Sequence, residues 1–434
     1  MFTYSRGVSA VLIIWTWAAV STPAPACAQS SLPPQVTLED AVRLAYERNP
    51  ILQAARAAIE VATADRVTAR ARPNPAVTFD SVGRPPAARP AVPDDHEYLI
   101  RVDQELETAG RRRLRLEAAA TGVRVATSQA EDAQRRVELD VRKAYFQVVL
   151  AKADLEVART TLAEIEQIIS VNQARFAQGE ISGGELRRTQ VERLRFVDDA
   201  FASELALRNA RAALLTLLNA PDLAQPIDVT DTLAVPLAVG TQGGAPGPGL
   251  DVSSLRARAV AERPDLQAAA SAVERADTET RLQRALRRPN VTVGGGYSHL
   301  GGLNTVAFGV TVPVPLFNRN AGGVARADAE ARVAQHQRDA AALTVALDVQ
   351  QATNAVDVSR TRVAAIEREF LTPSRESRDI VLAAYRLGDA NLIDLLDAQR
   401  AYRDTQRTYN RALFDRQISL VELAAAIGSP LTQP

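Results

Sequence analysis

The stretch LEDAVRLAYERNPILQAARAAIEVATADRVTARARPNPAV, residues 38–77, returns later in the chain as VSSLRARAVAERPDLQAAASAVERADTETRLQRALRRPNV, residues 252–291. Pro50 and the Gln-Ala pair three positions after it match Pro264 and its own Gln-Ala pair, 214 positions further on. The two copies are 214 positions apart, too far for the units of a solenoid, which run about 20–50 residues. The pattern therefore predicts one architecture built from two similar halves.

The repeat continues beyond these stretches and sets the expected boundaries of the halves. RFAQG at residues 175–179 pairs with AYRLG at residues 384–388. We expect a first repeat at residues 29–220 and a second at residues 251–434. Residues 221–250 contain TQGGAPGPG and are predicted to be a linker or equatorial segment, because Pro and Gly interrupt regular structure.

Residues 1–28 are typical of a secretory signal peptide. Arg6 is followed by an apolar run from Val8 to Val20 and by a small-residue cleavage site that ends at Ala28. That run is shorter than the ~20 residues that a membrane-spanning helix needs. The alternative is lipoprotein processing, in which Cys27 becomes the lipidated first residue. Because Cys27 is the only cysteine in the chain, no disulfide is expected in either case.

Composition limits the classes of function. The 51 basic and 51 acidic residues cancel, which argues against a nucleic-acid surface or a polybasic membrane anchor. The chain carries no catalytic constellation and is not expected to be an enzyme. The run Gly294-Gly295-Gly296 is not followed by the Lys-Ser/Thr start of a helix, so it is not a phosphate loop, and no cofactor is expected.

Four segments alternate between apolar and polar residues and predict strands. They are expected at about residues 77–84, 97–106, 291–298 and 305–316. A soluble sandwich alternates in the same way, so the pattern alone leaves both readings open. Each run has the length that a tilted strand needs to cross a bilayer, but four strands cannot close a barrel. A barrel therefore requires three copies, with Pro85 to His96 and His299 to Asn304 as hairpin loops.

A long helical hairpin is expected after each pair of strands, at residues 110–219 and 320–427. Apolar residues in the first recur with the 3-and-4 spacing of a coiled coil. In the second, Pro373 is expected to bend the helix or break its hydrogen bonding locally. The predicted turn elements at the two tips are a glycine after each long helix and a capping residue before each return helix. These residues are Gly179, Ser182, Gly388 and Asn391.

Three motifs resemble the TolC-type outer membrane efflux factor family. YRLGDANLIDLLDAQRAY at residues 385–402, with its weaker copy RFAQGEISGGELRRTQVE at residues 175–192, is similar to the family's periplasmic tip motif. The pattern Leu-x-x-Ala-x-x-x-Ala-x-x-x-Asn-Pro at residues 38–50 is similar to its opening motif, and PVPLFNRNAG at residues 313–322 to its strand-to-helix turn. In the first copy this turn has the form Glu-x-x-x-x-Gly-Arg-Arg at residues 105–112, which points to the heavy-metal cation branch.

The resemblance implies a mainly helical TolC-like fold with a small β part. It also implies a homotrimer with a twelve-stranded barrel in outer membrane lipid and a helical barrel in the periplasm of a Gram-negative cell. Such a protein works passively, as the exit duct of a tripartite efflux system with a periplasmic adaptor and an inner membrane pump. Its substrate, a drug or a metal cation, stays open. A periplasmic coiled-coil adaptor and a type I secretion exit duct remain the alternatives.

The resemblance also implies a constriction at the periplasmic tip. Asp394 and Asp397 match an aspartate ring, Tyr385 matches a gate tyrosine, and Glu185 occupies an acidic gate position of the first copy. One position departs from the family, since Ala390 stands where a gate arginine is expected. Arg187 or Arg188 is our candidate replacement. The two aspartates lie three positions apart on one helix face, so three copies would bring six carboxylates together.

The histidines do not suggest a metal site. His96 and His299 are expected in the hairpin loops and His336 on a helix, without a paired spacing. No resident metal is therefore predicted.

Overall fold

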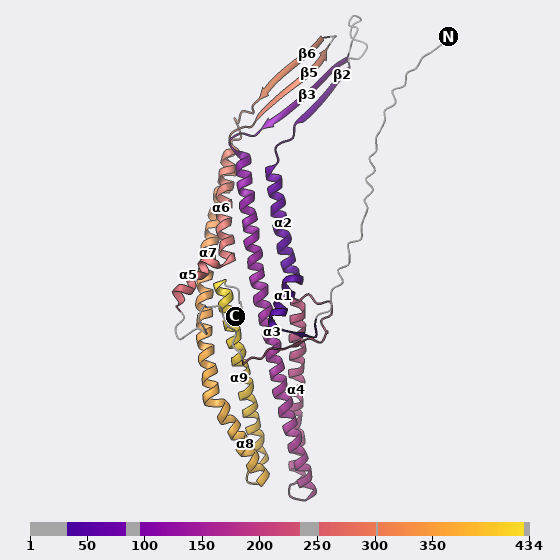
Figure 1. Cartoon of the computed structure of the whole chain (residues 1–434), viewed down its shortest axis with the longest axis vertical. Coiled ribbons are helices and arrows are strands. Elements are labelled where there is room, and N and C mark those ends of the chain that lie inside the picture. Colours follow the sequence, from indigo (N-terminus) through magenta and orange to yellow (C-terminus); the bar gives the residue numbers. More distant parts are fainter. Residues whose placement is uncertain (1–32, 84–95, 235–250, 301–302, 429–434) are drawn as a thin grey trace, which may run out of the picture.

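The computed structural model describes residues 33–83, 96–234, 251–300 and 303–428. These residues form a long rod, with one β-sheet at one end and the tips of two helical hairpins at the other (Figure 1). The predicted fold class, mainly helical with a small β part, is confirmed. The predicted signal peptide, with Cys27, lies outside the described residues, as does most of the predicted loop from Pro85 to His96.

Both halves of the chain have the same order of elements: a short helix, a second helix, two strands and a helical hairpin. The first half contains β1 (Gln35–Val36), α1 (Leu38–Arg48), α2 (Pro50–Arg70), β2 (Ala76–Gly83), β3 (His96–Leu106), α3 (Arg111–Ala177) and α4 (Gly183–Leu217), followed by β4 (Asp228–Val229). The second contains α5 (Val252–Glu262), α6 (Pro264–Ala285), β5 (Val291–Leu300), β6 (Leu303–Thr311), α7 (Ala321–Ile366), the π-helix η1 (Glu367–Leu371), α8 (Thr372–Leu387) and α9 (Leu392–Ile427).

The residue before each repeated proline joins two helices in the same way. Pro50 and Pro264 begin α2 and α6, where a missing N–H is tolerated. Asn49 donates from Nδ2 to the carbonyl of Leu217 at the end of α4, at 2.9 Å. Arg263 donates from Nη1 to the carbonyl of Ala426 at the end of α9, at 3.4 Å. Each half thus fastens its proline helix to the last turn of its own return helix.

The four long strands form one antiparallel sheet in the order β2-β3-β5-β6. Because side chains alternate along a strand, a row of paired residues shares one face. One such row is Phe79, Ile100, Tyr297 and Val306. The neighbouring row is Thr78, Arg101, Gly296 and Ala307. The sheet therefore has one apolar face and one face of polar, charged and small residues, as the alternation predicts.

Glycine on β5 makes room for an ion pair on the polar face. Arg101 Nε lies 2.9 Å from Asp103 Oδ1. Asp103 pairs directly with Gly294, and a Cβ atom on Gly294 would lie 1.9 Å from the same carboxylate oxygen. A Cβ atom on Gly309 in β6, by contrast, would meet nothing within 4 Å. A side chain at position 294 would therefore force the Asp103 carboxylate to move and would disturb its ion pair with Arg101.

Two strand limits differ from those predicted. β6 ends at Thr311, before Pro313 and Pro315, because proline cannot donate a ladder hydrogen bond. His299 lies in β5 instead of a loop, since the ladder continues as far as the pair Leu300 and Leu303. His96 likewise begins β3.

The described part of the predicted linker packs on the middle of the rod. Within it, β4 pairs in parallel with β1. Tyr145 of α3 donates its hydroxyl to Asp231 Oδ2 at 2.5 Å, and Lys152 Nζ lies 2.8 Å from Asp228 Oδ2. Residues 228–231 are therefore an ordered part of the fold at the middle of the rod.

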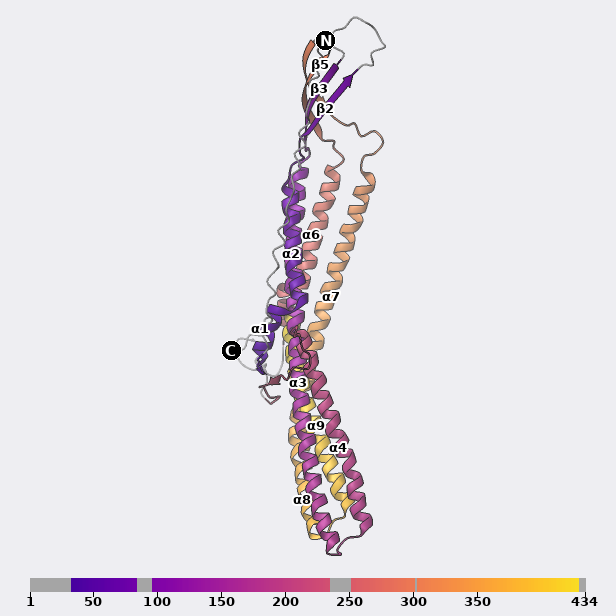
Figure 2. The same ribbon diagram turned by 90° about the vertical axis from the view of Figure 1, so that its right-hand side faces the viewer.

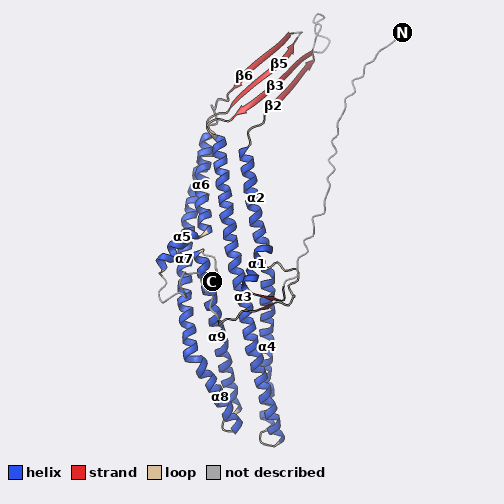
Figure 3. Ribbon diagram, in the orientation of Figure 1, coloured by secondary structure: helices blue, strands red, loops and turns tan. Residues whose placement is uncertain are grey.

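The second long helix is interrupted where the sequence predicts. The π-helix η1 separates α7 from α8, and Pro373 lies in the first turn of α8. Figure 3 shows α8 turned away from the line of α7 at this point. Both a π-turn and a proline disturb the regular hydrogen bonds of a helix, which accounts for the bend.

Towards the sheet, α6 lies between α7 and α3, as Figure 2 shows from the side. No helix within the described ranges is both long enough and apolar enough to span a membrane.

Candidate gate at the helical tip

Both helical hairpins turn at the end of the rod opposite to the sheet (Figure 1). Gly179 and Gly388 have φ values of 78° and 89°, the left-handed conformation that glycine adopts without strain. After each, an N–H bonds back to the carbonyl five residues earlier, from Glu180 to Arg175 and from Asp389 to Ala384. This bonding satisfies the last carbonyl groups of α3 and α8. The two tips are thus built alike.

Each return helix begins with a side-chain cap. Ser182 Oγ accepts from the N–H of Glu185 at 3.1 Å, and Asn391 Oδ1 accepts from the N–H of Asp394 at 3.0 Å. Carboxylates at this position also interact favourably with the positive end of the helix dipole. Glu185 and Asp394 therefore have a local structural role in starting α4 and α9, besides any role in a constriction.

Tyr385 is buried between the two hairpins. Its side chain is 4% exposed and belongs to an apolar cluster with Ile165 and Ile168 of α3, Phe196 of α4 and Leu395 of α9. Burial raises the pKa of its hydroxyl above the ordinary value of 10.0. The hydroxyl consequently remains protonated and able to donate a hydrogen bond.

A chain of buried hydrogen bonds connects Tyr385 to the first hairpin. The tyrosine hydroxyl donates to Asn172 Oδ1 at 2.7 Å, and Asn172 Nδ2 donates to Thr189 Oγ1 at 3.2 Å. Thr189 in turn donates to the carbonyl of Glu185 at 3.0 Å. Asn172 and Thr189 are both fully buried. Three helices, α8, α3 and α4, are thereby joined through one polar path inside an apolar cluster, where an unpaired polar group is costly.

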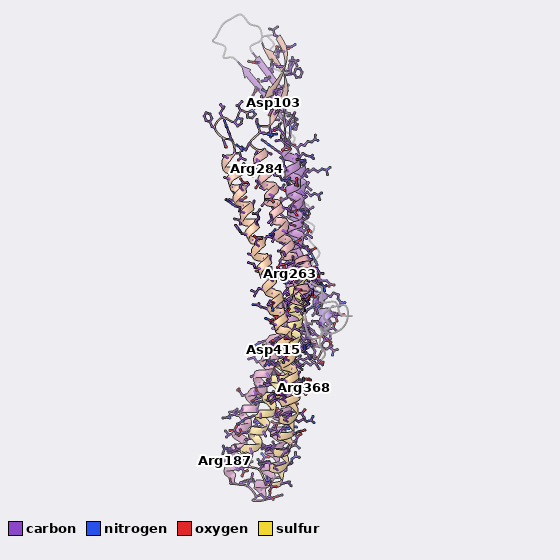
Figure 4. The ribbon with its side chains drawn as sticks, turned by 90° about the vertical axis from the view of Figure 1, so that its left-hand side faces the viewer. Asp103, Arg187, Arg263, Arg284, Arg368 and Asp415 are labelled. Atoms are coloured by element: carbon purple, nitrogen blue, oxygen red, sulfur yellow. The ribbon has the colours of Figure 1, made fainter. Side chains whose placement is uncertain are left out.

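Arg175 is the cation nearest to the candidate gate tyrosine. Its guanidinium carbon lies 5.7 Å from the centre of the Tyr385 ring, and its Nη1 donates to the Tyr385 carbonyl at 3.4 Å. Its Nε also pairs with Glu180 at 3.2 Å. Neither Arg187 nor Arg188 forms an ion pair with another described residue, and Figure 4 shows Arg187 at the tip. Within this chain, Arg175 therefore lies against Tyr385 from the first hairpin, and Arg187 or Arg188 stays the predicted gate arginine.

The two aspartates of the predicted ring lie on the exposed side of α9. Asp397 pairs with Arg400 Nη1 at 3.2 Å, whereas Asp394 forms no ion pair within the described part of the chain. Neither contacts Tyr385. The structure of one chain therefore brings Tyr385 together with Glu185 through Thr189, and it leaves the aspartates facing outward.

Ion pairs also join the lower hairpins, and the three shortest near the tip follow one pattern. Arg400 lies 2.5 Å from Glu192, and Arg407 lies 2.7 Å from Asp199. Arg378 of α8 lies 3.3 Å from Glu164 of α3, the third pair. In each of the three, the second half supplies the arginine and the first half the carboxylate.

Asn172, Thr189 and Arg175 were not predicted from the sequence. Asn172 interrupts the apolar 3-and-4 seam between Ile169 and Phe176. A lone asparagine in an apolar helical seam can fix the register of the helices. The sequence therefore contained a pattern from which a buried role for Asn172 could have been predicted. Nothing in the spacing of Arg175 or Thr189 indicates their contacts.

No metal site is apparent among the described residues. They contain no group of three or more His, Cys, Asp or Glu side chains that could hold an ion. His299 Nδ1 instead lies 2.6 Å from Asn304 Oδ1 across the β5-β6 hairpin.

Comparison with known proteins gives consistent matches. The family model described as outer membrane efflux protein matches residues 41–220 and 255–429. The cobalt-zinc-cadmium resistance protein CzcC of Cupriavidus metallidurans is 22% identical over 369 residues, covering 84% of this chain and 83% of CzcC. The outer membrane protein TolC of Vibrio cholerae is 25% identical over 328 residues, covering 72% of each chain. Among solved structures, the outer membrane protein VceC of Vibrio cholerae has a similar fold, with a TM-score of 0.74 and 19% identity over 91% of this chain and 97% of that one.

Proposed function

The chain belongs to the outer membrane efflux protein family, and from this premise we propose that it is the passive exit duct of a tripartite efflux system. Three copies form the duct. The sheet crosses the outer membrane, and the helices extend into the periplasm to meet an adaptor and an inner membrane pump. The tip motifs at residues 175–192 and 385–402 resemble the same family as the one whose model matches the chain.

The observation that carries this function is the two-faced sheet with its open edges. Within the described residues, no strand pairs with the outer edge of β2 or of β6. Unpaired strand edges are not tolerated in lipid, so the sheet must continue into other copies. Three sheets of four strands make a barrel of twelve, an even number as bacterial barrels require. The apolar row that contains Phe79 then faces lipid, and the row that contains Arg101 faces the lumen.

The tip is the closed end of the duct in this proposal. Tyr385 ties α8 to α3 and α4 within each copy, and Asp394 and Asp397 line the opening around the threefold axis. Opening requires the second hairpin to separate from the first, because Tyr385 bridges them. The bend at η1 gives α8 a natural point about which to move.

We propose a divalent metal cation as the substrate in preference to a drug. Two observations favour this choice: the similarity to CzcC along most of both chains, and the Glu-x-x-x-x-Gly-Arg-Arg turn at residues 105–112. Carboxylates around the opening also attract cations and repel anions. The cation passes through and is not retained.

The barrel is tested by a pair of substitutions on adjacent residues of β6. Val306→Lys places a charge on the lipid face and should reduce insertion, by about 2–4 kcal/mol near the membrane midplane. Ala307→Lys places the same charge on the lumen face and should leave insertion unchanged while altering conductance. The measurements are the fraction of heat-resistant trimer in outer membranes and single-channel conductance in planar bilayers. Equal insertion of the two variants would contradict the proposed orientation.

The substrate is tested in cells that lack their own metal efflux duct. Expression of this chain with its adaptor and pump should restore growth on cobalt, zinc or cadmium. Restored growth on drugs alone, without restored growth on metals, would reject a metal substrate. The proposed function as an exit duct would still stand.

A further inference from the structure

A cavity of about 210 Å³ lies behind Tyr385, between α3, α8 and α9. Its walls come from both hairpins, so any occupant touches the two parts that must separate for the tip to open. The lining residues are Glu164, Gln167, Ile168, Val171, Arg378, Leu382, Tyr385, Arg386 and Gln399.

Gln399 supplies a buried polar group to this cavity. Its side chain is only 1% exposed, although it lies on α9 in the middle of the hairpin contact. No other described residue forms a hydrogen bond with its side-chain amide. A buried amide without a partner is destabilising, and native proteins satisfy almost all such groups with protein, water or ligand. The Gln399 amide atoms are not among the fully buried polar atoms that lack a partner, so they open onto the cavity, where water or a ligand can supply the hydrogen bond.

The charge of the lining favours an anion. Arg378 pairs with Glu164 at 3.3 Å and with Asp379 at 2.6 Å, and it also lies over the ring of Tyr402 at 4.3 Å. Its charge is therefore compensated by two carboxylates. Arg386 is exposed and forms no ion pair within the described residues, so it is the lining cation that can pair with an anion.

The size and the remaining walls favour a small ring. Ile168, Leu382 and the ring of Tyr385 are apolar or aromatic surfaces. An apolar cavity of about 150 Å³ accommodates benzene, so the present one has room for a benzene-sized ring with short polar groups. Pockets of this kind bind through apolar walls and a few placed polar groups.

We propose that this cavity binds a small hydroxyaryl or similar monocarboxylate. Its ring packs on Ile168, Leu382 and Tyr385, its polar end bonds to the Gln399 amide, and its carboxylate pairs with Arg386. Because the ligand contacts α3 together with α8 and α9, its binding favours the conformation in which the hairpins are joined. Inhibition of opening by the ligand rests on the proposed function as an exit duct. Binding of the ligand to the cavity does not depend on that function.

Binding is tested on the full-length trimer in detergent with two probes, 4-hydroxyphenylacetate and phenylacetate, by ligand-observed NMR and calorimetry. Gln399→Leu should weaken 4-hydroxyphenylacetate about tenfold, the value of one hydrogen bond, and should leave phenylacetate unchanged. Arg386→Gln should weaken both probes. Arg375→Gln removes the same charge from an exposed position of α8 outside the cavity, and should weaken neither.

Two results would overturn the site. One is the absence of saturable binding to the wild-type protein, which means that the cavity holds water only. The other is binding that Gln399→Leu and Arg386→Gln leave unchanged while circular dichroism shows both variants folded.

Inhibition is measured separately, as open probability in planar bilayers with and without 4-hydroxyphenylacetate. Open probability should fall for the wild type and for Arg375→Gln, and should not change for Gln399→Leu. Saturable binding without a change in open probability overturns the inhibitory role. Failure of the wild type to conduct at all rejects the proposed function, while the titrations still decide the site.

Discussion

Replacing Tyr385 by phenylalanine removes one hydroxyl from the candidate gate and leaves the ring in place. The hydroxyl donates to Asn172 at 2.7 Å, and Asn172 is fully buried. Without this donor, Asn172 Oδ1 has no partner in the closed conformation, while Nδ2 still bonds to Thr189. The substitution therefore destabilises the closed tip selectively, because an open tip exposes Asn172 to water.

The expected magnitude follows from the burial of the bond. Leaving a buried acceptor without its donor costs about 1–3 kcal/mol. Since about 1.4 kcal/mol corresponds to a tenfold change in an equilibrium, the ratio of open to closed tips should rise about tenfold in Tyr385→Phe. The effect should be independent of pH below about 10: the raised pKa means that the folded protein holds this proton more tightly, so the bond is lost only as pH rises beyond the ordinary value of 10.0.

The assay is open probability in planar bilayers, with Tyr145→Phe as the matched control. Tyr145 is also buried and donates to Asp231 at 2.5 Å, so the control removes a buried tyrosine hydrogen bond in the middle of the rod, away from the tip. A double-mutant cycle with Asn172→Leu isolates the pairwise energy. An open probability in Tyr385→Phe equal to that of the control would refute the reasoning, as would additive effects in the cycle.

The other predictions concern the ring, the sheet and the middle of the rod. Asp394→Asn combined with Asp397→Asn should change conductance and reduce cation selectivity in planar bilayers, and unchanged values would remove the ring from the proposed gate. Gly294→Ala should lower the yield of folded trimer, by about 1–3 kcal/mol of overpacking, whereas Gly309→Ala should not; equal yields would contradict the close packing on the polar face. Arg263→Met removes the buried cation that pairs with Asp265 and Asp348 and should lower stability by about 1.5–3 kcal/mol, because both carboxylates are partly exposed; an unshifted midpoint in thermal denaturation would argue against the ion pairs.

The fold was largely predictable because its signals are periodic. Alternation identified the strands, and the offset between Pro50 and Pro264 identified the two halves. The exact ends of the strands could not be predicted, because they depend on how the strands pair with one another. The β5-β6 ladder includes His299 and ends at the pair Leu300 and Leu303. The sequence alone does not fix that register.

The candidate site was predictable only in part. Tyr385 was found through a motif, but its partner Asn172 lies 213 positions away on another helix. Arg175 contacts Tyr385 across the two hairpins, 210 positions away in the sequence, so its spacing gives no sign of the contact. Contacts of long side chains between the hairpins depend on how the hairpins pack together. They therefore cannot be predicted from spacing in the sequence.

The ion pairs between the lower hairpins also show that the two halves have diverged in charge where they meet. If the chain arose by duplication, each ancestral half had to associate with an identical copy, and identical surfaces cannot place all acids on one side and all bases on the other. Glu192 facing Arg400 and Asp199 facing Arg407 are asymmetric. At the offset of 209 that relates the two tips, a protein assembled from two first halves would set Val191 against Glu192 and Asp198 against Asp199, so neither ion pair would form. The halves have become complementary, and they are no longer interchangeable.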